Sequence, residues 1–206
     1  MKNKKYIIFD MDGTLIDSSK LLANTINYVR QNLALPKMED KVILEAINDP
    51  SVNAPIFFYE SEYFEEFHQE FFQEYYQENY KKDAQLYDGI KELIEKLSRT
   101  HKLSIATNAY KKSTSSILFS LGIEHYFDIV VCADEVKEAK PAPDMINLIT
   151  NFYEDSLDNF VLVGDSEKDL ESAQNANIDS ILVEWGFSSH NNSVNSVSEL
   201  TNLLYS

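Results

Sequence analysis

Two aspartates, Asp10 and Asp12, stand two residues apart in the segment FDMDGTLID, directly after a short apolar run. In extended backbone this spacing points both side chains to the same side, and Gly13 can supply a tight turn after them. Such a pair can share a divalent cation, since Mg²⁺ prefers oxygen ligands and commonly takes one or two carboxylates with water and substrate phosphate. The same residues could instead form a turn or cap a helix, so this segment alone leaves both interpretations open.

A second acidic segment, VLVGDSEKDL, contains Asp165 and Asp169. Residues four apart lie on one face where a helix begins, so both carboxylates can point the same way. Capping of that helix by Asp165 or Ser166 is the structural alternative. Two acidic loops at one edge of a sheet favour a metal site over two unrelated caps.

Two further segments between these loops could bind phosphate. The segment ATN ends with Thr107 and Asn108, and the segment AKPAPD contains Lys140. The Thr107 hydroxyl could donate a hydrogen bond to a phosphate oxygen, and the Lys140 ammonium could supply a compact positive charge. Alternatively, Lys140 is a solvated surface residue and the prolines that follow it start a helix.

The elements that would position these residues alternate along the chain. Five short apolar runs predict buried strands at 6–9, 103–106, 129–131, 160–163 and 181–183. Amphipathic segments at 89–99, 111–121, 144–153 and 167–176 predict helices, so the pattern is typical of a parallel α/β sheet. Ligands of such sheets lie beyond the carboxyl ends of the strands. Asp10, Thr107 and Asp165 follow three of the predicted strands, so we expect them at one edge.

The interval 16–87 interrupts this alternation with helical patterns at 18–33, 39–47 and 56–80. It predicts a helical domain inserted between the two parts of an α/β domain, which would comprise residues 1–15 and 88–206. Within 56–80, four aromatic residues at successive spacings of three, four and four are expected to pack inside the insertion; they are Phe64, Phe67, Phe71 and Tyr75. A contact between two copies of the chain is the alternative.

The composition excludes several classes of protein. The formal net charge of −16 opposes binding to nucleic acid or anionic lipid, which requires a basic surface. The single cysteine, Cys132, excludes an intramolecular disulfide and a cysteine zinc cluster. No apolar run approaches the roughly 20 residues that span a bilayer, and the first residues do not form a secretion signal. We therefore expect a cytoplasmic protein, a monomer or homodimer, without nucleic-acid or membrane partners.

The four polar segments, in this order and with the helical insertion after the first, resemble the haloacid dehalogenase (HAD) superfamily. The matching residues are DMDGT at 10–14, TN at 107–108, KPAPD at 140–144 and GDSEKD at 164–169. The position of the insertion resembles the phosphoglycolate phosphatase-like and β-phosphoglucomutase-like branch. The resemblance implies a Rossmann-like α/β core with a parallel sheet and a small all-helical cap inserted after the first strand.

The resemblance also implies the chemistry of the two opening aspartates. Asp10 would be the nucleophile, forming an aspartyl phosphate while its other oxygen binds Mg²⁺. Asp12 would protonate the leaving alcohol and then deprotonate the attacking water, and its backbone carbonyl would bind the metal. Family members that cleave carbon–halogen or carbon–phosphorus bonds lack an acid at this position, so Asp12 favours phosphate-ester chemistry.

The remaining site residues are also assigned by this resemblance. Thr107, Asn108 and Lys140 would hold the phosphoryl oxygens, and Asp165 would be the third metal ligand. Asp169 would complete the acidic group or orient Lys140. A Mg²⁺ ion and one lysine would together neutralise charge on the transferred phosphoryl group, which is the main requirement of phosphoryl transfer.

These inferences predict a Mg²⁺-dependent phosphoric monoester hydrolase whose partner is a small-molecule phosphate ester. Two alternatives remain: a phosphosugar mutase, which keeps both aspartates, and a non-catalytic binding protein on the same fold. Lys37 and Lys41 are the only lysine or arginine residues in 36–80. An acidic cap of this kind predicts a neutral or cationic leaving alcohol.

Overall fold

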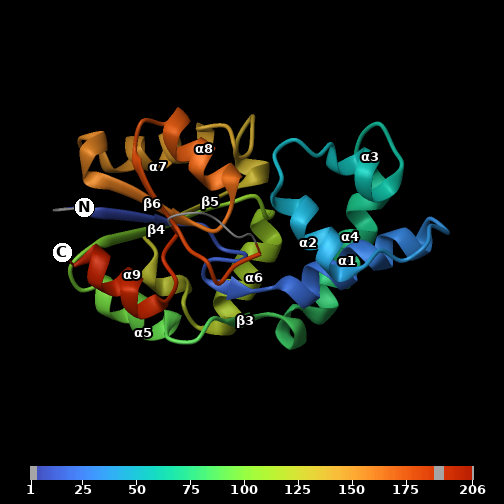
Figure 1. Ribbon diagram of the computed structural model, residues 1–206, viewed down its shortest axis with the longest axis horizontal. Helices are drawn as coiled ribbons and strands as arrows, with labels where there is room; N and C mark the ends of the chain where they lie inside the picture. The colour runs from blue at the N-terminus through green and yellow to red at the C-terminus, as the bar shows by residue number, and fades with distance from the viewer. Residues whose placement is uncertain (1–3, 188–192, 206) are drawn as a thin grey trace.

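A five-stranded parallel sheet forms the centre of the computed structural model, which describes residues 4–187 and 193–205 (Figure 1). Its strand order is β5-β4-β1-β6-β7, and every pair is parallel. The strands are β1 (Tyr6–Phe9), β4 (Lys102–Thr107), β5 (Ile129–Cys132), β6 (Phe160–Gly164) and β7 (Asp179–Leu182). The predicted α/β class with a parallel sheet is confirmed.

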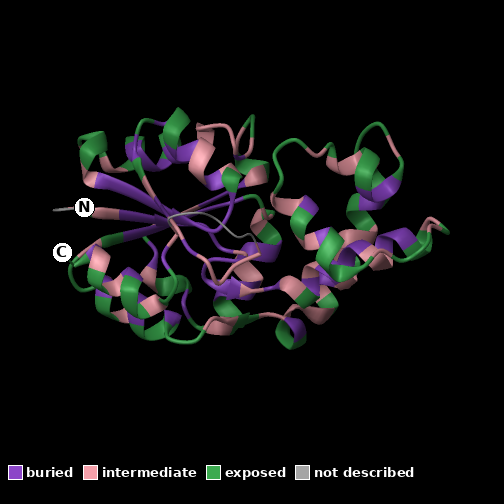
Figure 2. Ribbon diagram, viewed as in Figure 1, coloured by how far each residue is buried: buried purple, intermediate pink, exposed green. Residues whose placement is uncertain are grey.

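Helices cover both faces of the sheet, and alternate residues of β1 show why. Ile7 and Phe9 pack into one apolar cluster, whereas Ile8 packs into the cluster on the opposite face. The first cluster includes residues of α5 (Ile90–Leu97), α6 (Lys111–Leu121) and α9 (Val197–Leu204), and the second includes residues of α7 (Asp144–Tyr153) and α8 (Glu167–Asn175). Burial of β1 on both faces explains its continuous apolar sequence, and Figure 2 shows the strands buried.

Four helices lie together at one end of the sheet (Figure 1). They are α1 (Ser19–Asn32), α2 (Asp40–Asn48), α3 (Ala54–Tyr59) and α4 (Glu66–Asp83). They enclose an apolar cluster of their own, which includes Ile26, Val29, Ile43 and Phe58. A short antiparallel pair, β2 (Ile16–Asp17) with β3 (Gln85–Leu86), joins the start and the end of this segment.

The aromatic segment differs from its prediction. The expected continuous pattern over 56–80 is interrupted after α3, where Glu60 adopts a left-handed conformation with φ 55°. Phe64 and Phe67 contact the rings of Tyr59 and Phe71 but are 44% and 43% exposed, so the expected packing inside the insertion is only partial. His68 and Tyr76 are buried on α4 instead. Because aromatic residues occur on several sides of this helix, their spacing alone does not identify the face that packs.

Two other features of the fold bear on the sequence predictions. The β2–β3 pair was not predicted, because two-residue strands carry no periodic signal. Among the described residues, no helix is both long and apolar enough to cross a membrane. The polar sequence SSHNNSVNS at 188–196 predicts a loop before α9, and residues 188–192 of it lie outside the described part of the chain. The domain boundaries at 15/16 and 87/88 stay a prediction.

Candidate active site

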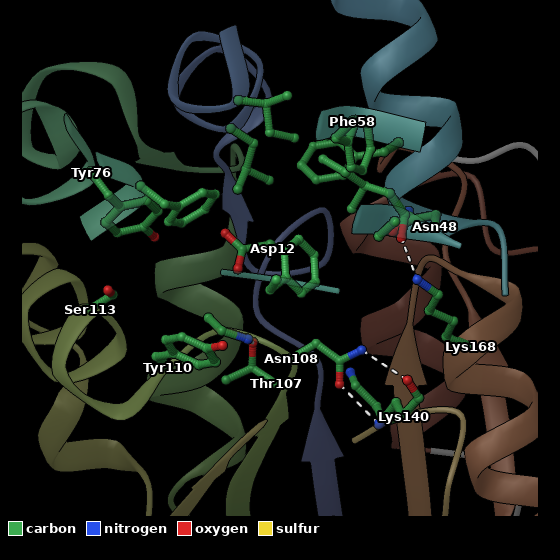
Figure 3. Close-up of a pocket in the computed structure, with 18 of the residues that line it drawn as sticks. Asp12, Asn48, Phe58, Tyr76, Thr107, Asn108, Tyr110, Ser113, Lys140 and Lys168 are labelled. Carbon is green, nitrogen blue, oxygen red and sulfur yellow. Dashed lines mark hydrogen bonds between the residues drawn. The ribbon is translucent and has the colours of Figure 1, made fainter. Parts of the chain in front are cut away.

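The four polar segments meet at one cavity, between the carboxyl edge of the sheet and the α1–α4 helices (Figure 3). The cavity has a volume of about 320 Å³. Six of the seven predicted site residues line it: Asp10, Asp12, Thr107, Asn108, Lys140 and Asp165. The seventh, Asp169, contacts Lys140 directly. The structure therefore brings all seven residues into one region, although they span 160 positions of the sequence.

Lys140 forms the centre of a buried ion-pair network. Its Nζ lies 2.6 Å from Asp10 Oδ1 and 2.6 Å from Asp169 Oδ1. Burial alone would lower the pKa of Lys140, but the negative charges of Asp10 and Asp169 outweigh it and hold the pKa above its ordinary value. Lys140 is thus a fixed positive charge beside the Asp10 carboxylate, and the solvated-surface alternative is wrong.

Asn108 holds the backbone of Lys140 through its side-chain amide. Asn108 Nδ2 donates to the Lys140 carbonyl at 2.9 Å, and the Lys140 N–H donates to Asn108 Oδ1 at 3.0 Å. Thr107 is buried at the end of β4, where its Oγ1 accepts the Ala109 N–H at 3.1 Å. The Thr107 hydroxyl therefore keeps its own proton for donation to another acceptor.

The first turn of α8 positions Asp169. Ser166 is the N-cap, and Asp169 Oδ2 accepts the Ser166 N–H at 3.1 Å in a capping box. The helix cap therefore exists, but it aims Asp169 Oδ1 at Lys140. Gly164 permits this approach, since a Cβ there would lie 2.4 Å from Asp169 Cγ. Of the two roles expected for Asp169, the contact fits the one that orients Lys140.

Asp165 receives hydrogen bonds from two distant parts of the chain. Its Oδ2 accepts the Phe187 N–H at 2.7 Å and Asn48 Nδ2 at 3.1 Å. A Cβ on either Gly13 or Gly186 would lie 2.4 Å from Asp165 Oδ2, so both backbones pass against this carboxylate. Sequence reasoning missed Asn48, Gly186 and Phe187. The sequence signal that could have identified this contact is Gly186, which follows the fifth predicted strand, 181–183, at the same edge of the sheet.

Three buried carboxylates form a group that suits a divalent cation. Oxygen atoms of Asp10, Asp165 and Asp169 lie within 4.8 Å of one another. Asp10 Oδ2 is buried and has no hydrogen-bond partner within the described residues, so it retains the capacity to bind a cation. An all-oxygen donor set is the one that hard divalent cations prefer. The side chain of Asp12 is not part of this group; its Oδ1 accepts the Ser18 hydroxyl.

The carboxylates raise one another's proton affinity. Burial raises the pKa of Asp10 to about 7; the charge of Lys140 opposes this shift, and those of Asp169 and Asp12 add to it. Burial, and then the charges of Asp10 and Asp169, raise the pKa of Asp165 well above its ordinary value. Burial also raises the pKa of Asp12, against its hydrogen bond from Ser18 and the charge of Lys140. A bound cation would counter these shifts and keep the carboxylates ionised.

The opposite wall of the cavity belongs to the α1–α4 helices. Lys168 Nζ, from α8, donates to the Ile47 carbonyl at 2.6 Å and so connects α2 to the core (Figure 3). His68 is 3% exposed and packs against the Tyr59 ring at 4.9 Å between centroids. His68 has no sequence neighbour at metal-ligand spacing, which predicts a solvated or packing role, and the structure shows the packing role.

Comparisons with known proteins agree with this geometry. The family model of the haloacid dehalogenase-like hydrolases matches residues 7–183. A phosphoglycolate phosphatase of Aquifex aeolicus is 28% identical over 184 residues, covering 89% of this chain and 86% of its own. A pyrophosphatase PpaX of Halalkalibacterium halodurans is 24% identical, covering 87% and 83%. The crystal structure of a predicted phosphoglycolate phosphatase from Haemophilus somnus superposes with a TM-score of 0.80 at 27% identity, covering 93% and 90%.

A parallel α/β sheet with buried carboxylates at its carboxyl edge fits a hydrolase whose reactive groups are aspartates. The chain belongs to the haloacid dehalogenase-like hydrolase family, whose model covers most of its length. The predictions of this superfamily, of its phosphoglycolate phosphatase-like branch and of a phosphatase-type hydrolase are therefore confirmed. Hydrolases of this kind generally use a divalent metal, and the buried aspartate group offers a place for one.

Proposed function

We propose that the chain is a Mg²⁺-dependent phosphatase that hydrolyses a small-molecule phosphate monoester through an aspartyl phosphate on Asp10. The observation that carries the proposal is the state of the Asp10 carboxylate. Lys140 holds Asp10 Oδ1, while Asp10 Oδ2 is buried without a hydrogen-bond partner within the described residues. One Asp10 oxygen would attack the phosphorus of a substrate in the cavity, and the other would bind a cation among the carboxylates. Phosphatase and pyrophosphatase relatives support phosphate release as the reaction.

Asp10 and Asp165 would hold the Mg²⁺ ion through their carboxylates, and Asp12 through its backbone carbonyl. Asp169 lies in the same carboxylate group, and its bond to Lys140 suits it to orient that lysine. When bound, the ion would neutralise charge on the carboxylates and on the phosphoryl oxygens. This supplies the positive potential that an acidic chain otherwise lacks.

The residues of the chain would carry out two displacements. Asp10 attacks phosphorus, and the bond to the leaving oxygen breaks as Asp12 donates its proton to that oxygen. Asp12 then takes a proton from water, which attacks phosphorus and releases inorganic phosphate from Asp10. Lys140 and the Thr107 hydroxyl hold the phosphoryl oxygens during both steps. Burial raises the pKa of Asp12, which suits a residue that must hold a proton at the start of the cycle.

The helices α1–α4 would act as a cap, with residues 1–15 and 88–206 forming the core and 16–87 the cap. The cap contributes one wall of the cavity. Closure over bound substrate would exclude bulk water until the second displacement. The hydrogen bonds from Lys168 to Ile47 and from Asn48 to Asp165 link the two parts at this point.

The substitution Asp10→Asn tests the proposal. We expect phosphate release from a panel of phosphate esters with Mg²⁺ to fall more than about 1,000-fold, because the nucleophile is lost. The exposed Asp158→Asn is the matched control and should keep full activity. Borohydride reduction during turnover, followed by mass spectrometry, should detect homoserine at residue 10 of the wild-type protein, the product expected from an acyl phosphate on Asp10. Substantial activity in Asp10→Asn, or isomerised sugar phosphate without released phosphate, would contradict the proposal.

A further inference from the structure

The cavity has two ends of different chemical character. One end contains the charged core residues, among them Asp10, Asp12 and Lys140. The other end is formed by the α1–α4 helices and is lined mainly by apolar and aromatic side chains, including Leu22, Ile26, Phe58, Phe72 and Tyr76. Within the described residues, no aspartate, glutamate, lysine or arginine of α1–α4 lines the cavity.

The four glutamates of α4 face solvent. Glu66, Glu70, Glu74 and Glu78 are spaced four apart on this helix, and all four are exposed. They form a stripe on its outer side, whereas Phe72 and Tyr76 line the cavity. The expectation of a cationic alcohol therefore loses its basis, because no carboxylate of these helices faces the substrate. A neutral alcohol remains consistent with the wall.

A carboxylate on the leaving alcohol would find no lysine or arginine of α1–α4 at the apolar end, where the polar lining groups of these described helices include the uncharged amides of Gln69 and Gln73 and the ring of His68. Two lysines line the described cavity, Lys140 and Lys168. Lys140 is held by two aspartates, and Lys168 donates to the Ile47 carbonyl. Transfer of an ionised carboxylate from water to an apolar wall is unfavourable unless a partner compensates. The wall therefore discriminates against a second anionic group on the substrate.

Tyr76 supplies an independent sign that a ligand belongs here. Its side chain is 2% exposed and stacks on Phe72 with centroids 5.9 Å apart. Its hydroxyl is buried and has no hydrogen-bond partner within the described residues. Figure 3 shows this hydroxyl on the side of the cavity that holds Asp12. A buried hydroxyl without a partner is costly, so an oxygen of a bound ligand would satisfy it.

We propose that the leaving alcohol is neutral and carries an apolar body of about one ring, held by Phe58, Phe72 and Tyr76. This inference rests on the proposed phosphatase function and specifies its substrate class. The Tyr76 hydroxyl donates a hydrogen bond to a substrate oxygen beside Asp12. A cavity of about 320 Å³ corresponds to about ten water molecules at their liquid volume, which leaves room for a ring beside the phosphate.

A series of three esters tests the substrate class: benzyl phosphate, ethyl phosphate and 2-phosphoglycolate, each assayed by phosphate release with Mg²⁺. Each buried methylene strengthens binding about fourfold. We expect kcat/KM for benzyl phosphate to exceed that for ethyl phosphate by at least about tenfold and to exceed that for 2-phosphoglycolate by more. An equal or greater kcat/KM for 2-phosphoglycolate would overturn the inference.

Variants of neighbouring residues on α4 test whether the aromatic wall causes the preference for benzyl phosphate over ethyl phosphate. Phe72→Leu should reduce the preference for benzyl phosphate over ethyl phosphate at least threefold, because it removes an aromatic surface from the cavity. Phe71→Leu, one position away and not among the residues that line the cavity, should leave the preference unchanged. Tyr76→Phe should lower kcat/KM for all three esters about tenfold, whereas Tyr75→Phe should not. An unchanged preference in folded Phe72→Leu would overturn the inference.

A binding experiment separates this inference from the proposed hydrolysis. Calorimetry with Asp10→Asn and Mg²⁺ would compare the affinities for benzyl phosphate and 2-phosphoglycolate without turnover. If the wild-type protein hydrolyses no ester but Asp10→Asn binds benzyl phosphate more tightly, the proposed reaction fails and the apolar site stands. If hydrolysis occurs and 2-phosphoglycolate binds equally or more tightly, the reaction stands and the apolar site fails.

Discussion

Lys140 depends on a single amide side chain, that of Asn108, for the placement of its backbone. The two hydrogen bonds between these residues are 2.9 and 3.0 Å long. They join the loop after β4 to the loop before α7, and so bring Lys140 within reach of Asp10. Asn108 is therefore a positioning residue through its side chain, in addition to the phosphate contact expected of its backbone.

The substitution Asn108→Ala tests this role. Loss of two hydrogen bonds should lower the free energy of unfolding by about 1–3 kcal/mol. Displacement of Lys140 should also lower kcat about tenfold or more, with a smaller change in KM, because Lys140 acts on the transferred phosphoryl group. Chemical denaturation and steady-state kinetics measure the two effects. The exposed Asn147→Ala should change neither, and a folded Asn108→Ala with normal kcat would refute the role.

The chemistry-bearing residues could be predicted because each lies in a short local pattern after a strand. Asp10, Thr107 and Asp165 follow apolar runs, and parallel strands present their carboxyl ends at one edge. The partners of those residues could not be predicted in this way. Asn48 lies 117 positions from Asp165, so their contact depends on how α2 sits against the core. The unpaired Tyr76 hydroxyl likewise becomes visible only when the packing is known.

The turn after β1 requires glycine for two separate reasons. Gly13 has φ 89°, and a Cβ there would lie 2.4 Å from Asp165 Oδ2. Gly122, at the end of α6, has φ 68°, but a Cβ there would meet open space, with no neighbouring atom within 4 Å. Both glycines therefore have a positive φ, but only at Gly13 would an added Cβ collide with a neighbouring side chain. This difference makes them a matched pair.

Gly13→Ala and Gly122→Ala should separate these two effects. Each alanine carries the left-handed conformational cost, about 1–2 kcal/mol of unfolding free energy. Gly13→Ala should in addition displace the Asp165 carboxylate, so Mg²⁺ affinity measured by calorimetry should fall at least about tenfold. Gly122→Ala should bind Mg²⁺ as the wild-type protein does. Equal Mg²⁺ affinities in the two folded variants would show that the turn does not constrain Asp165.

Most elements of the core could be predicted from the sequence because burial on both faces gives clear apolar runs. The helices at 111–121 and 144–153 have the expected bounds, and each strand lies within two residues of its prediction. The helices of the insertion were harder to predict. The helices α3 and α4 are separated at Glu60, and no local sequence pattern predicts the left-handed conformation of this residue. Aromatic residues around α4 then obscured which side packs.

The contact between α2 and α8 should control how firmly the cap closes. The Lys168 ammonium donates to the Ile47 carbonyl at 2.6 Å, and a hydrogen bond from a charged group contributes about 1.5–3 kcal/mol. In Lys168→Met we expect KM to rise about tenfold and amide exchange in α2 to accelerate, with a smaller change in kcat. Kinetics and hydrogen exchange test this, and Lys41→Met on exposed α2 surface is the control. Unchanged exchange in α2 would contradict the prediction.

The carboxylates of the molecule lie in two different environments, one exposed to solvent and one buried. The chain has 34 acidic and 18 basic residues. Solvent-exposed carboxylates such as those of α4 are screened by salt, whereas Asp10 and Asp165 are buried beside one another. Burial raises the pKa of both carboxyls, to about 7 for Asp10; the charge of Asp169 adds to both shifts and the charge of Lys140 opposes them. Each unit of such a shift corresponds to about 1.4 kcal/mol, so the buried group dominates the pH dependence of stability near neutrality.

Without divalent metal, the protein should lose stability as the pH rises from 4 to 7. In this window the unfolded chain has released the Asp10 proton while the folded chain still holds it, so deprotonation favours unfolding. Chemical denaturation in EDTA should show the decline, and Asp10→Asn should make it less steep, while the raised pKa values of Asp165 and Asp12 keep part of it. Mg²⁺ should stabilise the wild-type protein more at pH 8 than at pH 5. Asp155→Asn is the control, because hydrogen bonds, first from the Ser156 N–H, lower the pKa of the Asp155 carboxyl to about 2. Its contribution to stability is constant above about pH 4 and is lost only as the pH falls below that value. A pH-independent stability in EDTA would contradict the prediction.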